Sequence, residues 1–460
     1  MRNRLVIIGG DAAGMSAATQ ARARRDASDL EIVVFERGPD TSYSACGIPY
    51  WVGEVIDDRD DLVVRTPQEF RERNDIDARV LHEVVAIDLD ARTVRVRDLA
   101  NGAEADEPYD QLLLATGASP LRPDLPGVQG PGVFGVQALD DGQAVIDHLD
   151  ALDRTTPRAV VVGAGYIGLE MAEAFVVRGL EVHLVDRSPR PMNTIDVDMG
   201  DRIADAMEGM GITLHLGVDV HGITHDDDGN VAAVETSDGD LPADLVLLGT
   251  GARPNVQLAR DAGIPIGRAG GIRVDVQQRT PIEDVWAAGD CAEVHHRVSR
   301  QPAAIALGTI ANKTGRIAGI NLGGGYATFP GVLGTAITKV CGVEISRTGL
   351  GEDEARRFGY EPVCAVVSST TTAGYWPEAK PMSVKVIAER DTGRLLGAQI
   401  VGEAGSAKRI DTLAAALWNE MSVSELQYLD LSYAPPFSPT WDPVLIAARK
   451  AWDALEDARS

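Results

Sequence analysis

The sequence has few cysteines, and their spacing forms no pair. Its 460 residues include Cys46, Cys291, Cys341 and Cys364, and none of these belongs to a CxxC motif. This absence argues against a zinc site and against a thioredoxin-type dithiol, and we expect no metal site. Because we expect a cytoplasmic protein, in which structural disulfides are rare, each cysteine has to be judged by its own surroundings.

Long apolar runs are also absent. No segment approaches the roughly 20 continuous apolar residues that a membrane helix needs. The apolar residues near the N-terminus lead into a glycine turn and not into the cleavage site of a secretory signal. Apolar residues still make up 44% of the chain, which is enough for sizeable cores. We therefore expect a globular protein with several domains and no membrane partner.

Lysine is scarce, since the first one in the chain is Lys313. The net charge is −26 at pH 7. A strongly acidic surface repels nucleic acid and anionic lipid, so neither is an expected partner. This balance is typical of a high-GC or salt-adapted host and says little about the reaction.

The N-terminal segment has the order of elements of a dinucleotide-binding unit. An apolar strand over 5–8 leads into a glycine-rich turn and an alanine-rich helix over 15–25, and a second strand over 31–35 ends at Glu36. An acid about 20 residues past such a turn can accept hydrogen bonds from ribose hydroxyls. The pattern predicts a nucleotide site.

The turn itself reads Gly9-Gly10-Asp11-Ala12-Ala13-Gly14. Gly9 permits the tight turn, and Gly14 lets the helix pack close to the strand. The helix N-terminus presents free N–H groups to a pyrophosphate. Asp11 departs from the pattern, because the middle glycine of G-x-G-x-x-G is an acid here.

A second copy of the unit begins at a strand over 159–162. Its turn matches the glycine pattern in full, and its second strand, over 181–185, leads to Asp186. Two copies argue against a plain αβ turn in either place. An acid here pairs with a free 2′-hydroxyl and repels a 2′-phosphate. Asp186 therefore favours NADH, while Arg187 and Arg190 leave NADPH possible.

Two later segments end in turns that suit a flavin. A strand over 112–114 runs into Thr116 and Gly117, and a strand that begins at Val285 runs into Gly289 and Asp290, with a helix expected near Ala303. The Asp290 carboxylate suits a ribityl hydroxyl of the flavin. An ordinary helix cap is the alternative.

Cys46 is the cysteine whose surroundings point to chemistry. It lies in TSYSACGIPYWVGEVI, over 41–56, where Gly47 and Pro49 predict a turn into a short helix. A thiol at a helix N-terminus has a lowered pKa, because the peptide dipoles stabilise the thiolate. We expect a nucleophile that is ready at neutral pH; a small buried cysteine is the alternative. The other three cysteines are expected to be structural.

Together these motifs resemble the flavoprotein disulfide reductases that have two dinucleotide-binding domains. GGDAAGMSAA, YSACGIPYWVG, LLLATGASP, GAGYIGLEMAE, AAGDCAE and YAPPFSPTWDP resemble the single-cysteine branch, which includes coenzyme A-disulfide reductases, NADH oxidases and NADH peroxidases. The glutathione-reductase branch would show a closely spaced cysteine pair and a C-terminal His-Pro motif, and neither is present. The resemblance implies FAD and NADH as cofactors, a homodimer, and electron transfer from NADH through FAD to Cys46.

The resemblance also implies which residues bind the cofactors. Glu170 resembles the family residue that lies beside the nicotinamide. The cofactor-binding residues are expected to be Gly9, Gly10, Ala13, Gly14, Glu36, Arg37, Ser42, Thr116, Gly117, Gly163, Gly165, Ile167, Gly168, Glu170, Asp186, Arg187, Gly251, Gly289 and Asp290.

Within the branch, the C-terminal segments resemble coenzyme A-disulfide reductases most. Tyr375 and Tyr433 match two tyrosines that in those enzymes reach the active site of the partner subunit. A tyrosine hydroxyl can protonate a leaving thiolate, and a buried, satisfied hydroxyl is the alternative. Arg22 and Arg65 best match basic positions that bind coenzyme A phosphates, with solvated surface arginines as the alternative. The expected substrate is coenzyme A disulfide or a related disulfide or persulfide.

Other activities stay open. Ala12 stands where oxidases and peroxidases usually carry a histidine, which argues against them, and Ala45 stands where the reductases commonly carry an asparagine. The alternatives are an NADH oxidase or peroxidase that acts through a Cys46 sulfenate, an electron-transfer reductase for a ferredoxin or quinone, and a redox-sensing flavoprotein that binds a partner.

The predicted fold class is α/β, with two Rossmann-type domains and a C-terminal α+β domain. We predict a split FAD domain over 1–118 and 247–325, an NAD(P)H domain over 119–246, and a dimerisation domain over 326–460. A run of three glycines at 323–325 marks the last linker. A strand over 383–389 and a helix over 407–421 are expected in the third domain.

Overall fold

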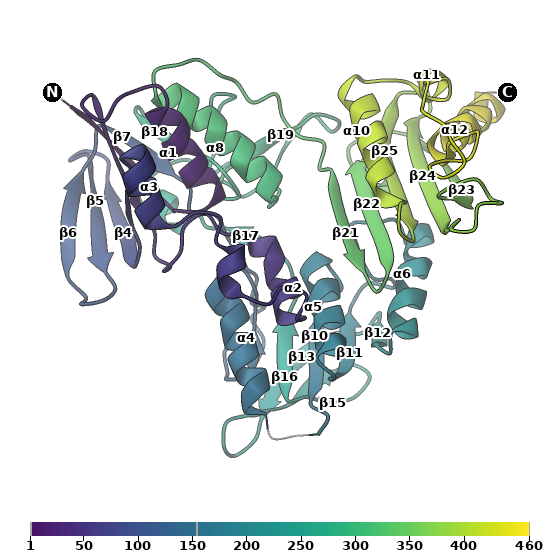
Figure 1. Cartoon of the computed structure of the whole chain (residues 1–460), viewed down its shortest axis with the longest axis horizontal. Coiled ribbons are helices and arrows are strands. Elements are labelled where there is room, and N and C mark those ends of the chain that lie inside the picture. Colours follow the sequence, from purple (N-terminus) through teal and green to yellow (C-terminus); the bar gives the residue numbers. More distant parts are fainter. Residues whose placement is uncertain (1, 153–154, 460) are drawn as a thin grey trace.

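The computed structural model describes residues 2–152 and 155–459. In these residues three sheets have five strands each, and each sheet is the centre of one part of the molecule in Figure 1. We propose to divide the chain accordingly into an N-terminal unit (2–117 and 255–325), a middle unit (118–152 and 155–254) and a C-terminal unit (326–459).

The sheet of the N-terminal unit is parallel, in the order β18-β7-β1-β2-β3. The apolar runs that predict strands near 5–8 and 31–35 form its centre, and their side chains are buried on both faces as a parallel sheet requires. The strand that pairs with β7 on the outside, β18, comes from far along the chain. The strands are β1 (Asn3–Ile8), β2 (Leu30–Phe35), β3 (Asp77–Arg79), β7 (Gln111–Leu114) and β18 (Val285–Ala287).

Helices α1 and α8 pack closely against each other because α8 offers glycines at the contact. A Cβ on Gly315 or Gly319 would lie 2.2 or 2.3 Å from carbonyl oxygens of α1. The helix expected near Ala303 begins at Gly308 instead, because the antiparallel pair of β19 (Val294–His296) and β20 (Gln301–Ala303) precedes it. The other elements of this unit are α1 (Ala12–Arg22), η1 (Ala45–Gly47), α2 (Ile48–Val52), η2 (Arg59–Leu62), α3 (Pro67–Asn74), β4 (His82–Asp88), β5 (Thr93–Asp98), β6 (Glu104–Pro108), α7 (Gln257–Asp261) and α8 (Gly308–Leu322).

The middle unit repeats the parallel arrangement, in the order β12-β11-β10-β16-β9. The boundary predicted between 246 and 247 falls inside β16 (Leu245–Leu248), all four residues of which pair with β10. The chain enters and leaves this unit through the antiparallel pair of β8 and β17. Its other elements are β8 (Ala118–Pro120), β9 (Val133–Phe134), α4 (Leu139–Ala151), β10 (Arg158–Val162), α5 (Tyr166–Val177), β11 (Glu181–Asp186), α6 (Val197–Gly209), β12 (Thr213–Leu216), β13 (Val220–His225), β14 (Val231–Thr236), β15 (Leu241–Pro242) and β17 (Ala252–Pro254).

The C-terminal unit is an antiparallel sheet, β21-β22-β25-β24-β23, with helices packed on it. The strand predicted over 383–389 lies within β24, and the helix predicted over 407–421 is a short 3₁₀ turn followed by α10. Its elements are β21 (Ala336–Val340), β22 (Val343–Gly349), α9 (Glu352–Arg357), β23 (Pro362–Thr370), β24 (Pro381–Glu389), β25 (Leu395–Gly402), η3 (Ala407–Arg409), α10 (Ile410–Trp418), α11 (Val423–Leu426) and α12 (Pro443–Arg459).

The predicted fold class is confirmed: two parallel α/β sheets precede an antiparallel α+β part. In the described ranges, no helix combines the length and the apolar composition that crossing a membrane requires.

Candidate active site

The two glycine turns have the same backbone geometry. Gly9 and Gly163 have φ of +107° and +105°, in the region that favours glycine. A Cβ on Gly14 would lie 1.9 Å from the Gly9 oxygen, and a Cβ on Gly168 would lie 1.9 Å from the Gly163 oxygen. The two helices can therefore start this close to their strands only with glycine at both places. The first turn has this geometry even though Asp11 stands where the second turn has Gly165.

The acids that follow the second strands also make equivalent contacts in the two copies. Each carboxylate accepts one hydrogen bond from the second residue of its glycine turn and one from the residue two places after itself. The four bonds are Gly10 N to Glu36 at 2.6 Å, Gly38 N to Glu36 at 2.7 Å, Ala164 N to Asp186 at 2.6 Å and Ser188 N to Asp186 at 2.7 Å. Glu36 and Asp186 thus occupy the same place relative to their glycine turns, and both remain candidate ligands of a dinucleotide ribose.

The N-terminal unit fits FAD. Among the described residues, no side chain caps the N-terminus of α1 or α5, so N–H groups of the first turns can bind a pyrophosphate. Asp290 has a buried Oδ1 atom without a hydrogen-bond partner in the described part of the chain, and burial raises the pKa of this carboxyl to about 6. A hydroxyl donor would satisfy that oxygen, which fits a ribityl hydroxyl.

The other residues predicted for this site surround the first turn. Ser42 donates its N–H to the Gly10 oxygen at 3.0 Å, and the Thr116 hydroxyl donates to the Asn255 oxygen at 2.7 Å. A Cβ on Gly289 would lie 2.7 Å from the Cβ of Ala13. These contacts support the first glycine turn from below. Gly117 takes no part in them, since a Cβ on Gly117 would meet open space. Arg37 is exposed beside them.

Of the residues predicted around the second turn, some belong to helix α5 and the others lie in the neighbouring loops. Gly165 is the N-cap of α5, and Ile167 packs against the core that α5 shares with α2. Arg187 is exposed just after Asp186. Gly251 lies next to the β8–β17 pair with φ of +96° and accepts the N–H of Leu121 at 2.8 Å.

Cys46 lies where the N-terminal and middle units meet. It is in the 3₁₀ turn η1, directly before α2, and Pro49 is in the first turn of that helix as predicted. Ile48, Trp51 and Val52 of α2 are buried in the same core cluster as α5 of the middle unit. The packing of α2 against the middle unit therefore places Cys46 near the second glycine turn.

The prediction that Cys46 has a lowered pKa is wrong in this structure. Burial raises the pKa of the thiol, and the carboxylates of Glu170, Asp290 and Asp11 raise it further. A short turn followed by the five-residue α2 supplies little helix dipole, while three nearby acids oppose the negative thiolate. Cys46 as a whole residue is exposed at the surface, although the groups around its sulfur exclude much of the solvent.

Glu170 approaches Cys46 from α5 and is itself held by the C-terminal unit. Thr338 of β21 donates a hydrogen bond from its hydroxyl to Glu170 Oε1 at 2.5 Å. Burial raises the pKa of Glu170, and this hydrogen bond offsets part of the increase. Thr338 is a site residue that sequence reasoning missed, because 168 positions separate it from its partner and no local motif marks it.

The other three cysteines lie in structural positions. The Cys291 side chain is fully buried and its sulfur faces two backbone carbonyl oxygens. Burial raises the pKa of Cys341 and of Cys364 to about 12. Of the four cysteines only Cys46 is exposed. No group of three or more His, Cys, Asp or Glu side chains within 2–152 and 155–459 is arranged to hold a metal ion.

The geometry does not support Arg22 as a phosphate ligand. Its guanidinium donates four hydrogen bonds to backbone carbonyl oxygens, those of Asn74, Arg25, Leu30 and Asp75. Arg22 therefore ties α1 to the end of α3. Arg65 lies over the Phe70 ring, 5.0 Å from its centroid, with one long contact to Asn74 at 3.5 Å, and it stays a candidate substrate ligand.

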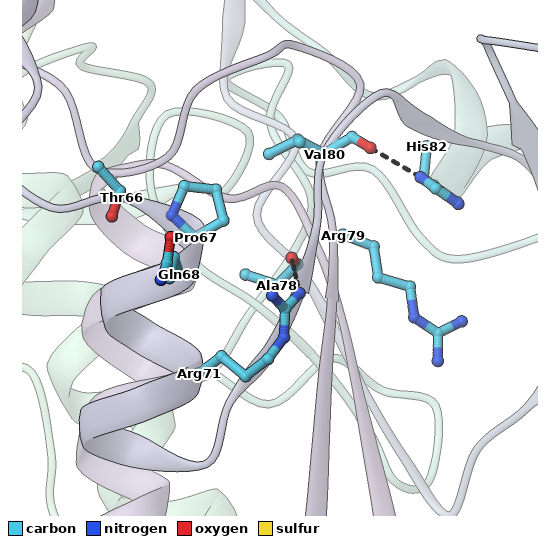
Figure 2. Close-up of a pocket in the computed structure, with 8 residues that line it drawn as sticks. All are labelled: Thr66, Pro67, Gln68, Arg71, Ala78, Arg79, Val80 and His82. Carbon is cyan, nitrogen blue, oxygen red and sulfur yellow. Dashed lines mark hydrogen bonds between the residues drawn. The ribbon is translucent and has the colours of Figure 1, made fainter.

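A pocket next to Arg65 contains two other arginines (Figure 2). It is lined by Thr66, Pro67, Gln68, Arg71, Ala78, Arg79, Val80 and His82. Both arginines already pair with acids of the protein, Arg71 with Asp77 at 3.5 Å and Arg79 with Asp77 and Glu107 at 2.8 Å each. None of the predicted site residues lines this pocket, and we assign it no role.

Tyr375 and Tyr433 lie next to each other on the C-terminal unit. They are 75% and 49% exposed, so neither is the buried, satisfied tyrosine that was the alternative. Desolvation raises the pKa of Tyr375, and a hydrogen bond with the Tyr433 side chain adds to this increase.

Comparison with protein families decides the class of this site. Residues 3–308 match the family described as pyridine nucleotide-disulphide oxidoreductase, and residues 335–443 match the dimerisation domain of the same family. The chain is a pyridine nucleotide-disulphide oxidoreductase. This confirms the resemblance found in its motifs. Members of the family use FAD and NAD(P)H, and the two glycine turns of this oxidoreductase fit the two nucleotides.

Relatives of this oxidoreductase cover nearly its whole length. It is 39% identical over 451 residues to the NAD(P)H sulfur oxidoreductase (CoA-dependent) of Pyrococcus furiosus, with 97% of this chain and 99% of the relative covered. It is 32% identical over 451 residues to the coenzyme A disulfide reductase of Staphylococcus epidermidis, with 98% and 100% covered. The solved structure of the water-forming NADH oxidase from Lactobacillus brevis, bound to NADH, superposes with a TM-score of 0.94 at 28% identity and covers all of both chains.

Proposed function

We propose that this oxidoreductase uses NAD(P)H to reduce a low-molecular-weight disulfide or persulfide through Cys46, with coenzyme A disulfide as the first candidate. The observation that carries the proposal is the convergence at Cys46: an exposed cysteine lies between the two nucleotide units, beside Asp11 and Asp290 of one and Glu170 of the other. The names of the two relatives, a CoA-dependent sulfur oxidoreductase and a coenzyme A disulfide reductase, support the substrate class.

Cys46 acts as the nucleophile. Its thiolate attacks one sulfur of the substrate disulfide, the substrate S–S bond breaks, and the second sulfur leaves as a thiolate that takes up a proton. The product is a mixed disulfide on Cys46. One cysteine suffices because the second sulfur belongs to the substrate. FAD, when bound, supplies the electron relay between the nicotinamide and this sulfur.

The glycine turns and their acids hold the two nucleotides. Glu36 and Asp290 would accept hydrogen bonds from hydroxyls of FAD, and Asp186 would accept from the ribose of the coenzyme. An acid at that position favours NADH over NADPH. Arg187 stays exposed beside it and keeps NADPH available as a second coenzyme.

Two copies of the chain assemble through their C-terminal units, which match the dimerisation domain of the family. The exposed pair of Tyr375 and Tyr433 then lies at the Cys46 of the partner subunit. Tyr433 protonates the leaving thiolate and Tyr375 supports it through their hydrogen bond. Arg65 binds a phosphate of the substrate.

The decisive experiment compares Cys46→Ser with the wild type in NADH-dependent reduction of coenzyme A disulfide without oxygen. We expect a loss of about a hundredfold or more, while NADH still bleaches the flavin of both proteins. Cys341→Ser is the matched control and should keep wild-type activity. Full disulfide reduction by Cys46→Ser would disprove the proposal.

The likeness to a water-forming NADH oxidase favours one second candidate, oxygen reduction through a Cys46 sulfenate. An oxidase stalls without oxygen, whereas a disulfide reductase continues to consume NADH when a disulfide is present. The mass of the intact, denatured protein gives an independent answer: an adduct of coenzyme A size on Cys46 identifies the substrate class. If Cys46→Ala retained turnover with a protein or quinone acceptor, an electron-transfer role would replace both candidates.

A further inference from the structure

The segment over 187–196 connects β11 to α6 and folds back onto the second glycine turn. The Met192 N–H donates to the Ala164 oxygen, within the turn, at 2.7 Å. Met192 is fully buried and has φ of +63°, so this contact fixes the backbone at Met192 against the turn. A Cβ on Gly200 of α6 would lie 3.0 Å from the Cβ of Arg190. The segment, the start of α6 and the turn therefore form one packed body.

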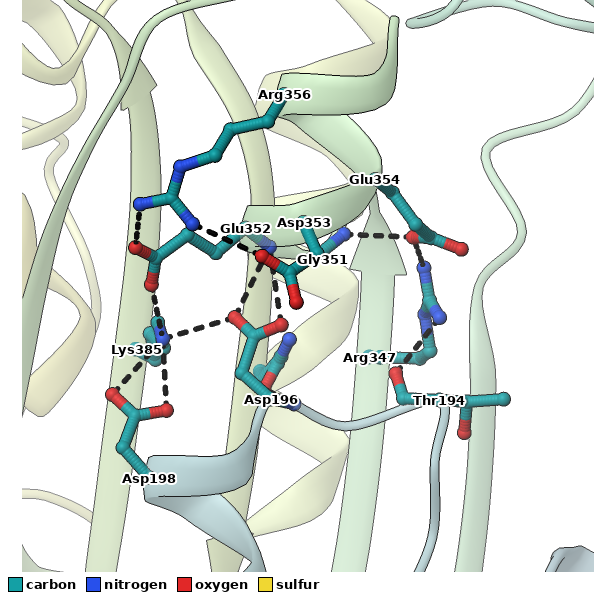
Figure 3. Close-up of polar contacts among 11 residues, drawn as sticks. Thr194, Asp196, Asp198, Arg347, Gly351, Glu352, Asp353, Glu354, Arg356 and Lys385 are labelled. Atoms are coloured by element: carbon teal, nitrogen blue, oxygen red, sulfur yellow. Dashed lines mark hydrogen bonds and ion pairs between the residues drawn. The ribbon is translucent and has the colours of Figure 1, made fainter. Parts of the chain in front are cut away.

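Lys385 of the C-terminal unit holds the far end of this segment (Figure 3). Its ammonium group lies 3.0 Å from Asp196, 2.8 Å from Asp198 and 3.0 Å from Glu352. The lysine side chain is 1% exposed. Burial lowers the pKa of Lys385, but hydrogen bonds to the surrounding carboxylates raise it more, so the group is a permanent cation between acids of two units.

Two further side chains of the C-terminal unit hold the same segment. Arg347 donates to the Thr194 oxygen at 2.8 Å and to Glu354 at 2.5 Å. Gln399 accepts the N–H of Asp196 at 2.9 Å. The segment next to the glycine turn is thus shaped by strands β22, β24 and β25 as well as by its own unit.

Loss of Lys385 would change this contact more than loss of the Gln399 bond, which joins two neutral groups. Asp196, Asp198 and Glu352 would lose the ammonium group that lies between them, and Arg356 would remain as a cation partner of Glu352 alone. Removal of one partner from a buried ion pair leaves an uncompensated charge. The Asp198 carboxylate would move away from Glu352, while Asp196 would be held by the Glu352 N–H at 3.1 Å without the ammonium group. The segment would then be held less firmly against the glycine turn, which it contacts through Met192.

We infer that Lys385 is a positioning residue for the nicotinamide coenzyme, since it holds the segment over 187–196 and the start of α6 in the shape in which the second glycine turn takes up the adenosine half. The inference rests on the proposed assignment of that turn to the coenzyme. It does not depend on the identity of the disulfide.

The test is coenzyme binding by Lys385→Met holoenzyme. The apparent Kd scales inversely with the fraction of molecules in the binding shape, so a fall of that fraction to about one tenth raises the Kd about tenfold. We expect this increase for ADP-ribose in calorimetric titration and for NADH in anaerobic flavin reduction. The limiting rate of flavin reduction and the KM for coenzyme A disulfide should stay within about twofold.

Three variants make the result specific. Lys380→Met removes an exposed lysine that pairs with Glu403 inside the C-terminal unit at 3.4 Å, and it should bind ADP-ribose like the wild type. Lys385→Arg keeps the cation and should recover most of the affinity. Asp198→Asn should weaken ADP-ribose binding less than Lys385→Met does. Combined with Lys385→Met, it should remove part of the repulsion among the carboxylates, so the double variant should bind ADP-ribose more tightly than Lys385→Met alone.

ADP-ribose affinity within twofold of the wild type in both Lys385→Met and Asp198→Asn would overturn the inference. If Lys385→Met does not fold, Asp198→Asn decides alone. The proposed function fails by a different observation, disulfide reduction by Cys46→Ser, so the two failures are distinguishable.

Discussion

The Thr338 hydroxyl donates a hydrogen bond to the Glu170 carboxylate across the boundary between the C-terminal and middle units, at 2.5 Å. Glu170 is in turn the first of the three acids that raise the pKa of Cys46. A threonine of the dimerisation domain therefore holds the carboxylate that faces the proposed nucleophile.

Thr338→Val should raise the pKa of Glu170. The hydrogen bond from Thr338 lowers the pKa of this buried carboxyl, so its loss leaves Glu170 protonated up to a higher pH. Cys46 ionises at a higher pH than a carboxyl does, so Glu170 is the group that reports the change. The pH profile of the infrared band of the protonated Glu170 carboxyl should move to higher pH. Thr335→Val, which breaks a bond to Thr348 within the C-terminal unit, should leave that profile in place.

Asp11→Asn should stabilise the flavin-free chain at pH 7 but not at pH 3. Burial raises the pKa of Asp11 from 3.8 to about 6, so the folded state binds more protons than the unfolded state between these values. Stability is therefore lost as the pH rises through this window. A pKa difference of one between the folded and unfolded states corresponds to about 1.4 kcal/mol. Because the Asp11 carboxyl is partly solvated, we expect Asp11→Asn to increase the free energy of unfolding by about 1 to 2 kcal/mol at pH 7. Thermal unfolding measures it.

The exposed Asp90→Asn is the control for that measurement and should show no gain. Equal unfolding temperatures of Asp11→Asn and the wild type at pH 7 would contradict the prediction.

Asp290→Ala should release FAD. Its buried Oδ1 has no partner in the described residues, and a hydrogen bond to a charged group contributes about 1.5 to 3 kcal/mol, or a factor of about ten to a hundred in affinity. Fluorescence of flavin released on dilution measures the loss. Asp290→Asn keeps an acceptor oxygen and should retain more FAD than the alanine variant. Equal retention by both variants would exclude this hydrogen bond.

Tyr433→Phe should lower kcat for disulfide reduction about a hundredfold, because a positioned general acid typically contributes a factor of about 10² to 10⁴. Flavin reduction by NADH should be unaffected. Tyr428→Phe is a suitable control, since this tyrosine is also exposed on the C-terminal unit. An unchanged kcat in Tyr433→Phe would remove this residue from the mechanism.

The parts of the site that the sequence predicts well are those set by neighbouring residues. Gly9 and Gly163 are required by a positive φ, and Gly14 and Gly168 by the close approach of a helix to its strand. These requirements are local, so the glycine pattern indicates both nucleotide turns even though Asp11 interrupts the first.

The parts that the sequence did not predict depend on contacts between distant segments. Thr338 and Lys385 acquire their importance from acids of another unit. The sign of the Cys46 pKa shift was wrong for the same reason, because the opposing acids come from three separate segments. Arg22 matched a family position, but the backbone carbonyls around it could not be located from the sequence.

The late arrival of β18 in the N-terminal sheet has a consequence for synthesis of the chain. β18 (Val285–Ala287) pairs with β7 only after the whole middle unit has been made. Domains generally fold as units while the ribosome is still translating. The middle unit can therefore close first on the nascent chain, while the N-terminal sheet stays open at one edge until β18 has left the exit tunnel.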